Sequence, residues 1–185
     1  MKVLVTGGAG FIGSHLVDRL VRDGEDVTVI DNLSTGRVDF IYRHVASGKI
    51  KFLEGDLLNR TFLKKIPKVD FVFHLAANPE VRLGVESPRT HFEQNVVATF
   101  NLLEMVRASK IKKFAFTSTS AVYGEAAEIP TPEGYPAEPI SLYGASKLAC
   151  EALMMSYAHT FGIQCWIFRF ANVVGPRGTH GVLVD

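Results

Sequence analysis

The chain has 185 residues, of which 47% are hydrophobic and 21% charged, a composition typical of one globular domain and unlike that of a disordered segment. Lys and Arg total 20 against 19 Asp and Glu, and this balance excludes a strong overall field that would recruit nucleic acid or an anionic membrane. No apolar run approaches the roughly 18 to 20 residues that span a bilayer, and the N-terminus MKVLVTGG lacks a secretory-signal pattern, so we expect a cytoplasmic protein without nucleic-acid or membrane partners.

Six short apolar segments rich in Val, Ile and Phe are predicted to be strands. They cover residues 2–7, 26–31, 50–56, 70–77, 112–118 and 164–170. None alternates cleanly between apolar and polar residues, as is typical of strands covered on both faces.

Helical periodicity fills the segments between these strands. Three sets of residues each share a helical face: Gly13, Leu16, Val17 and Leu20; Val96, Phe100, Leu103 and Val106; Leu148, Ala152 and Met155. Repeated β-α units predict an α/β protein with a doubly wound, mostly parallel sheet and helices on both faces, the Rossmann fold. Ligands of such sheets bind beyond the carboxyl ends of the strands.

A glycine-rich segment, TGGAGFIG at residues 6–13, follows the first strand and opens a helix. Its glycines fit two spacings, one with Gly8, Gly10 and Gly13 and the other with Gly7 in place of Gly8. Such a turn lets backbone N–H groups approach a pyrophosphate that faces the positive end of the helix. A plain structural turn is the alternative.

Asp31 ends the second strand about twenty residues further on, where a carboxylate accepts hydrogen bonds from an adenosine ribose. A carboxylate there would repel the 2′-phosphate of NADP, so the sequence favours NAD as the cofactor. Arg37 favours NADP instead, because its guanidinium could accommodate that phosphate. Asp31 could also cap only the turn that follows it.

Tyr143 and Lys147 are spaced i, i+4 in YGASK, on a helix that Ser141 can cap. A phenol of ordinary pKa near 10 is no base at neutral pH, and we expect the nearby ammonium to lower the pKa of Tyr143. An exposed tyrosine beside a solvated lysine is the alternative. Hydroxyls at residues 117–120 end the fifth strand, where one could bind the reacting oxygen or serve only a turn.

The cysteines, Cys150 and Cys165, fit neither a metal-ligand nor a disulfide spacing. We therefore expect free, buried thiols and no metal site.

Together the motifs TGGAGFIG, DNLSTG, GDL, HLAA, TSTSAVYG and YGASK, in this order, resemble the extended short-chain dehydrogenase/reductases of the NAD-dependent epimerase/dehydratase family, in particular the nucleotide-sugar epimerases. The resemblance implies that NAD is held by Gly7, Gly10, Phe11, Ile12, Gly13, Asp31, Asn32, Asp56, Leu57, Ala76, Ala77, Tyr143 and Lys147. It further implies Thr119, Tyr143 and Lys147 as catalytic residues, with Thr119, Tyr143 and Asn172 contacting a nucleotide sugar.

The reaction that the resemblance implies is epimerisation at carbon 4 of a UDP-hexose, such as UDP-glucose and UDP-galactose. Tyr143 takes the hydroxyl proton while hydride passes to NAD, and hydride then returns to the opposite face of the ketone. Ser120 and Ala121 stand where related dehydratases carry two acids, which disfavours dehydration. Another nucleotide-sugar-modifying reductase, a decarboxylase or a non-catalytic dinucleotide-binding protein are the alternatives.

Family members are longer than this chain and build their substrate domain mainly from the C-terminal portion. We therefore expect an NAD-binding domain at residues 1–175 and the start of a substrate domain at 176–185, in a piece of a longer protein rather than a shortened relative. The resemblance also suggests a homodimer joined through helices around residues 87–108 and 143–161.

Overall fold

The computed structural model describes residues 1–178 and contains a single parallel sheet with the strand order β3-β2-β1-β4-β5-β6. Its strands are β1 (Lys2–Thr6), β2 (Asp26–Asp31), β3 (Ile50–Glu54), β4 (Phe71–His74), β5 (Lys113–Thr119) and β6 (Gln164–Phe170). The chain proceeds outward from β1 to β3 and then crosses back to β4 on the other side of β1. This confirms the predicted α/β fold and places the reversal of strand order between β1 and β4.

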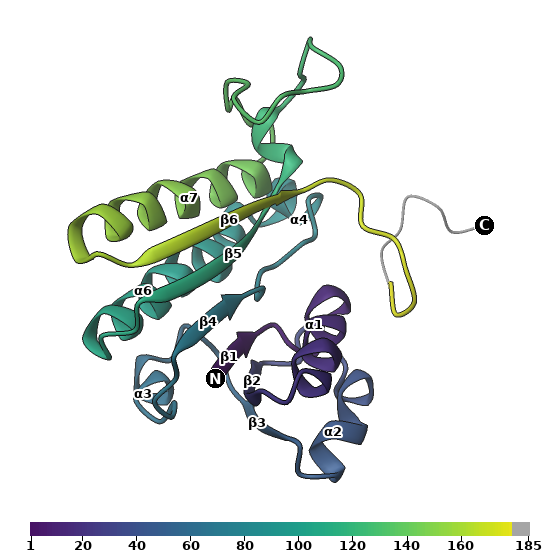
Figure 1. Cartoon of the computed structure of the whole chain (residues 1–185). Coiled ribbons are helices and arrows are strands. Elements are labelled where there is room, and N and C mark those ends of the chain that lie inside the picture. Colours follow the sequence, from purple (N-terminus) through teal and green to yellow (C-terminus); the bar gives the residue numbers. More distant parts are fainter. Residues whose placement is uncertain (179–185) are drawn as a thin grey trace.

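Helices cover both faces of the sheet, with α1 and α2 on one side and α6 and α7 on the other (Figure 1). The longer helices are α1 (Phe11–Arg22), α6 (Ala98–Ala108) and α7 (Leu142–Phe161), and the short ones are α2 (Tyr42–Ala46), α3 (Arg60–Leu63), α4 (Leu83–Glu86) and α5 (Pro88–His91). The 3-10 turns are η1 (Val38–Phe40) and η3 (Ser120–Tyr123), and η2 (Phe92–Val97) is π-helical.

Neighbouring residues of β1 serve two separate apolar cores, because successive side chains of a strand point to opposite faces. Val3 and Val5 pack with α1 and α2, whereas Leu4 packs with α6 and α7. All three side chains are fully buried. The two cores fix the sheet between its helical layers, as is expected for strands covered on both faces.

Helix α7 begins where the sequence predicts, because the Ser141 hydroxyl accepts a hydrogen bond from the Gly144 N–H at 3.0 Å. It ends at Gly162, whose φ of 62° is the left-handed cap conformation that glycine favours. The packing face differs from the apolar one seen in the sequence, since Ala152 and Met155 are exposed. The buried face carries Cys150 and Met154 of the core together with the polar residues Ser146, Lys147 and Glu151.

The described chain ends against α1. The Pro176 carbonyl oxygen lies 2.8 Å from Nε2 of His15, and the Arg177 guanidinium donates to the Asp18 carboxylate at 2.7 Å. Residues 176–178, predicted to begin a substrate domain, therefore contact α1, and residues 179–185 of that segment lie outside the described residues.

Within residues 1–178, no helix has the length and apolar character needed to cross a bilayer. Cys150 and Cys165 are free thiols, the first buried and the second half-buried.

Candidate active site

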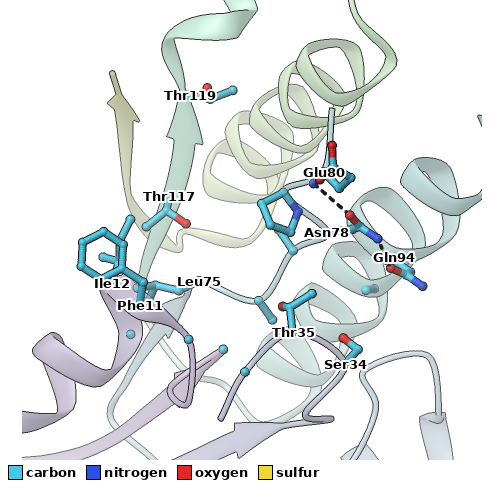
Figure 2. A pocket seen from close by; sticks show the side chains of 18 of the residues that line it. Phe11, Ile12, Ser34, Thr35, Leu75, Asn78, Glu80, Gln94, Thr117 and Thr119 are labelled. Carbon is cyan, nitrogen blue, oxygen red and sulfur yellow. Dashed lines mark hydrogen bonds between the residues drawn. The ribbon is translucent and has the colours of Figure 1, made fainter. Parts of the chain in front are cut away.

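A cavity of about 550 Å³ opens at the carboxyl edge of the sheet and extends from Ser34 and Thr35 to Thr119 (Figure 2). Every residue that the family resemblance implied for the cofactor, the substrate or catalysis lines it. They are Gly7, Gly10, Phe11, Ile12, Gly13, Asp31, Asn32, Asp56, Leu57, Ala76, Ala77, Thr119, Tyr143, Lys147 and Asn172. Segments far apart in the sequence therefore meet at the edge that the doubly wound topology predicts.

The turn after β1 leaves no room for a Cβ beside neighbouring backbone atoms at two of its positions. Gly7 has a φ of +71°, and a Cβ there would lie 2.6 Å from the Ala76 nitrogen. A Cβ at Gly13 would lie 2.1 Å from the Gly7 oxygen. Gly8 instead faces Val29 beneath the turn and does not line the cavity, so the structure selects the spacing that includes Gly7.

The N-terminus of α1 faces the cavity through Phe11 and Ile12, and no side chain caps its first turn at Gly10. Its N–H groups and the positive end of the helix dipole are therefore available to an anion. The glycine turn leaves the space beside them free of side chains. This arrangement fits a diphosphate group.

Asp31 connects two loops at the end of the cavity next to β2. Its carboxylate accepts hydrogen bonds from the N–H groups of Ala9 at 3.0 Å and Leu33 at 2.9 Å, and only 7% of the residue is exposed. Burial raises the pKa of Asp31, although both backbone N–H groups act in the opposite direction. The carboxylate thus holds the glycine turn to the loop after β2 while it lines the cavity.

Asn32 and Asp56 join the loops after β2 and β3, because the Asn32 amide donates to the Asp56 carboxylate at 3.0 Å. Arg37 does not line the cavity, and its guanidinium lies near Asp39 at 3.4 Å. Among the described lining residues, the Lys and Arg side chains are only those of Arg82 and Lys147. Arg37 is thus not placed to accept a 2′-phosphate in this cavity.

Tyr143 and Thr119 lie together at the other end of the cavity. Burial raises the pKa of the Tyr143 phenol, and the Thr119 hydroxyl beside it partly opposes this shift. The Thr119 oxygen accepts a hydrogen bond from the Ala121 N–H at 3.2 Å, so the hydroxyl keeps its own proton to donate. The pair can therefore exchange a proton with, and hydrogen-bond to, one ligand oxygen.

Lys147 is only 3% exposed, and its ammonium donates to the Thr117 carbonyl at 2.8 Å. It also lies 4.7 Å from the centre of the Phe116 ring. Burial lowers the pKa of Lys147 to about 8, opposed by the charges of Cys150 and Glu151. The sequence predicts that this ammonium lowers the pKa of Tyr143. That prediction was wrong, because desolvation of the phenol dominates and raises its pKa.

Polar side chains that the sequence argument missed line the cavity after β4. Asn78 donates to Gln94 at 2.8 Å and accepts from the Glu80 N–H at 3.0 Å (Figure 2). Asn78 follows a predicted strand directly, so its position was a usable signal. Gln94 lies inside a segment that reads as an ordinary helix, and nothing in the sequence reveals its π-helical turn.

The model of the NAD dependent epimerase/dehydratase family matches residues 3–183. A UDP-glucose 4-epimerase of Streptococcus mutans serotype c is 40% identical over 98% of this chain and 55% of its own length. A crystal structure of a UDP-galactose 4-epimerase is 52% identical with a TM-score of 0.91, over 98% of this chain and 60% of that one. The UDP-glucose 4-epimerase of Thermus thermophilus, in complex with NAD, is 38% identical with a TM-score of 0.90, over 98% and 59%.

This chain spans between 53% and 60% of the length of the curated relatives that it matches. The family match, in contrast, covers nearly all of it. The chain therefore belongs to the NAD dependent epimerase/dehydratase family.

Proposed function

We propose that the protein carrying this chain is an NAD-dependent nucleotide-sugar epimerase that interconverts UDP-glucose and UDP-galactose. The observation that carries the proposal is the shape of one cavity, with a glycine turn near one end and Tyr143, Thr119 and Lys147 at the other. The names of the relatives support the choice of a UDP-hexose as the substrate.

NAD fits the cavity residues described above. The glycine turn and the N-terminus of α1 would hold its diphosphate, and Asp31 with Asn32 would hold the adenosine ribose. The Asp31 carboxylate and the orientation of Arg37 support NAD over NADP. When bound, NAD supplies the acceptor and donor for hydride.

Burial raises the pKa of the Tyr143 phenol, so the positive charge of the oxidised nicotinamide of bound NAD would be needed to stabilise the phenolate. Tyr143 would then accept the proton of the sugar 4-hydroxyl as that carbon is oxidised to a ketone. Thr119 would donate a hydrogen bond to the same oxygen, since its own oxygen is already bonded to the Ala121 N–H. The proton returns from Tyr143 when the ketone is reduced on its other face. Proton and hydride are both recovered, so the cycle has no net redox change.

The test is product analysis on the full-length protein, supplied with NAD and a panel of UDP- and dTDP-hexoses. We expect UDP-glucose and UDP-galactose to interconvert, and Tyr143→Phe to lower the rate by about 100-fold or more while NAD remains bound. Tyr42→Phe is the matched control, because Tyr42 is exposed on α2 and does not line the cavity. An unchanged rate for Tyr143→Phe would sink the proposed mechanism.

The homodimer is also a proposal. It is supported by large apolar side chains that are exposed on η2, α6 and α7, namely Phe92, Phe100, Met155 and Phe161. These side chains are exposed on the helical layer that the resemblance assigns to the subunit contact. The cytoplasmic location stays a prediction of the sequence.

A further inference from the structure

An ion pair with a buried carboxylate and a partly exposed guanidinium lies behind the reacting groups, and the proposed chemistry does not use it. Glu151 of α7 is 2% exposed, and its carboxylate accepts from the Arg169 guanidinium of β6 at 2.7 Å and 3.1 Å. Buried ion pairs contribute little net stability, because desolvation cancels much of the attraction. A role in stability alone is therefore a weak explanation for this pair.

The same carboxylate is bonded to the strand that carries Thr119. Ser118, buried beside Thr119 in β5, donates its hydroxyl to Oε1 of Glu151. One helical turn earlier, Lys147 donates in the opposite direction, from α7 to the Thr117 carbonyl. Two adjacent residues of β5 are thus tied to two residues of α7 spaced i, i+4.

The bridge continues from β6 to η3, the turn that follows β5. The Arg169 guanidinium also donates to the Tyr123 hydroxyl at 2.9 Å, and its centre lies 4.9 Å from that ring. Tyr123 in turn donates to the Glu133 carbonyl at 3.2 Å. The guanidinium is therefore held on several sides, which restricts where the Glu151 carboxylate can lie.

We propose that the bridge of Ser118, Glu151 and Arg169 is a positioning device, which fixes the Tyr143 end of α7 against the end of β5 that carries Thr119. For its catalytic consequence the inference rests on the proposed function. Proton transfer requires the phenol and the Thr119 hydroxyl to meet one substrate oxygen, and small misplacements of reacting groups cost large factors in rate. Ser118 lines the cavity as well, and we assign the effect of Ser118 and Glu151 to their hold on Tyr143 and Thr119.

Ser118→Ala tests the bridge without leaving a charge unpaired, since Glu151 and Arg169 still pair with each other. Tyr157→Phe is the matched control. It also removes one hydroxyl that is hydrogen-bonded to a glutamate, in this case Glu104, and it also removes a hydrogen bond between α7 and a neighbouring element, α6. Tyr157 lies near the far end of α7, away from the cavity.

We expect Ser118→Ala to lower kcat about tenfold in the full-length protein, with KM for the sugar nucleotide and retention of NAD nearly unchanged. Amide hydrogen exchange at residues 145–148 should also become faster, because that end of α7 is less firmly tied. Tyr157→Phe should change neither kcat nor exchange at these amides.

Equal effects of the two variants, or a normal kcat for Ser118→Ala in an active enzyme, would overturn the inference. If the unmodified protein converts no sugar nucleotide, the proposed function fails on its own. Hydrogen exchange then decides whether the bridge positions α7, and unchanged exchange in Ser118→Ala would reject it.

Discussion

Lys147 shows how burial changes the behaviour of a residue at this site. Its ammonium is buried near the Thr117 carbonyl and the Phe116 ring, and this burial lowers its pKa to about 8. A lysine in the unfolded chain releases its proton near pH 10.5, the ordinary value. The folded chain therefore loses this proton first as the pH rises.

This difference predicts how Lys147 changes stability with pH. Between about pH 8 and pH 10.5 the unfolded chain binds one more proton than the folded chain, so stability rises with pH across that window. Relative to Lys147→Met, the unmodified protein should gain about 2 to 3 kcal/mol in its free energy of unfolding from pH 7.5 to pH 10.5. Urea titrations of both proteins at several pH values measure this, and a constant difference across the window would contradict it.

The sequence predicted which residues meet at the site, and it did so because the motif residues follow strands whose carboxyl ends share one edge. It could not predict what each group contacts. The partner of the Lys147 ammonium is the backbone carbonyl of Thr117, and backbone partners leave no signal in the identity of a residue. The direction of the pKa shift at Tyr143 depends on burial, which a motif does not report.

At the scale of elements, the turn between β1 and α1 requires glycine for two reasons. One is its backbone conformation, and the other is the close approach of the segment after β4 to the turn. Gly7 and Gly24 both have positive φ, +71° and +78° respectively. A Cβ at Gly24 would meet nothing within 4 Å, whereas one at Gly7 would lie 2.6 Å from the Ala76 nitrogen. The two positions therefore separate backbone strain from steric overlap.

Gly24→Ala should cost about 1 kcal/mol of stability, from backbone strain alone, and should leave NAD affinity unchanged. Gly7→Ala should cost several kcal/mol and weaken NAD binding at least tenfold, because the overlap must displace backbone that lines the cavity. Thermal unfolding and NAD titration of the two variants check this. Equal losses in both would show that the close approach at Gly7 is unimportant.

Helix α7 shows where reasoning from amphipathic pattern fails. The sequence predicted the helix and its Ser141 cap, and the structure confirms both. It did not predict that the buried face carries Lys147, Glu151 and Ser146, because polar residues on a helix normally mark the exposed face. Here a site and an ion pair occupy the face toward the sheet, and Met155 is left outside.

At the scale of the whole molecule, the strands and their connections were predictable, since short apolar runs alternating with helical segments favour one topology. All six predicted strands are present in the sheet. The division of residues 87–108 into α5, the π-helical η2 and α6 was not predictable. That break depends on tertiary contacts, such as the bond from the Asn78 N–H to the Asn95 side chain.

The proposed homodimer gives a prediction at this scale. Phe100 is 41% exposed on α6, among the exposed apolar side chains of η2, α6 and α7, and Phe100→Glu should convert dimers into monomers because it would bury a charge at the contact. Tyr42→Glu is the control, an aromatic residue on α2, across the sheet from α6 and α7. Gel filtration with light scattering measures the masses, and a dimer unaffected by Phe100→Glu would place the contact elsewhere.

The central claim is that one dinucleotide extends from the glycine turn to Tyr143. A structure of the full-length protein with NAD tests it most directly. We predict that the diphosphate lies over the turn formed by Gly7, Gly10 and Gly13, with the nicotinamide next to the Tyr143 phenol. A dinucleotide bound elsewhere, or one whose nicotinamide lies far from that phenol, would contradict the account.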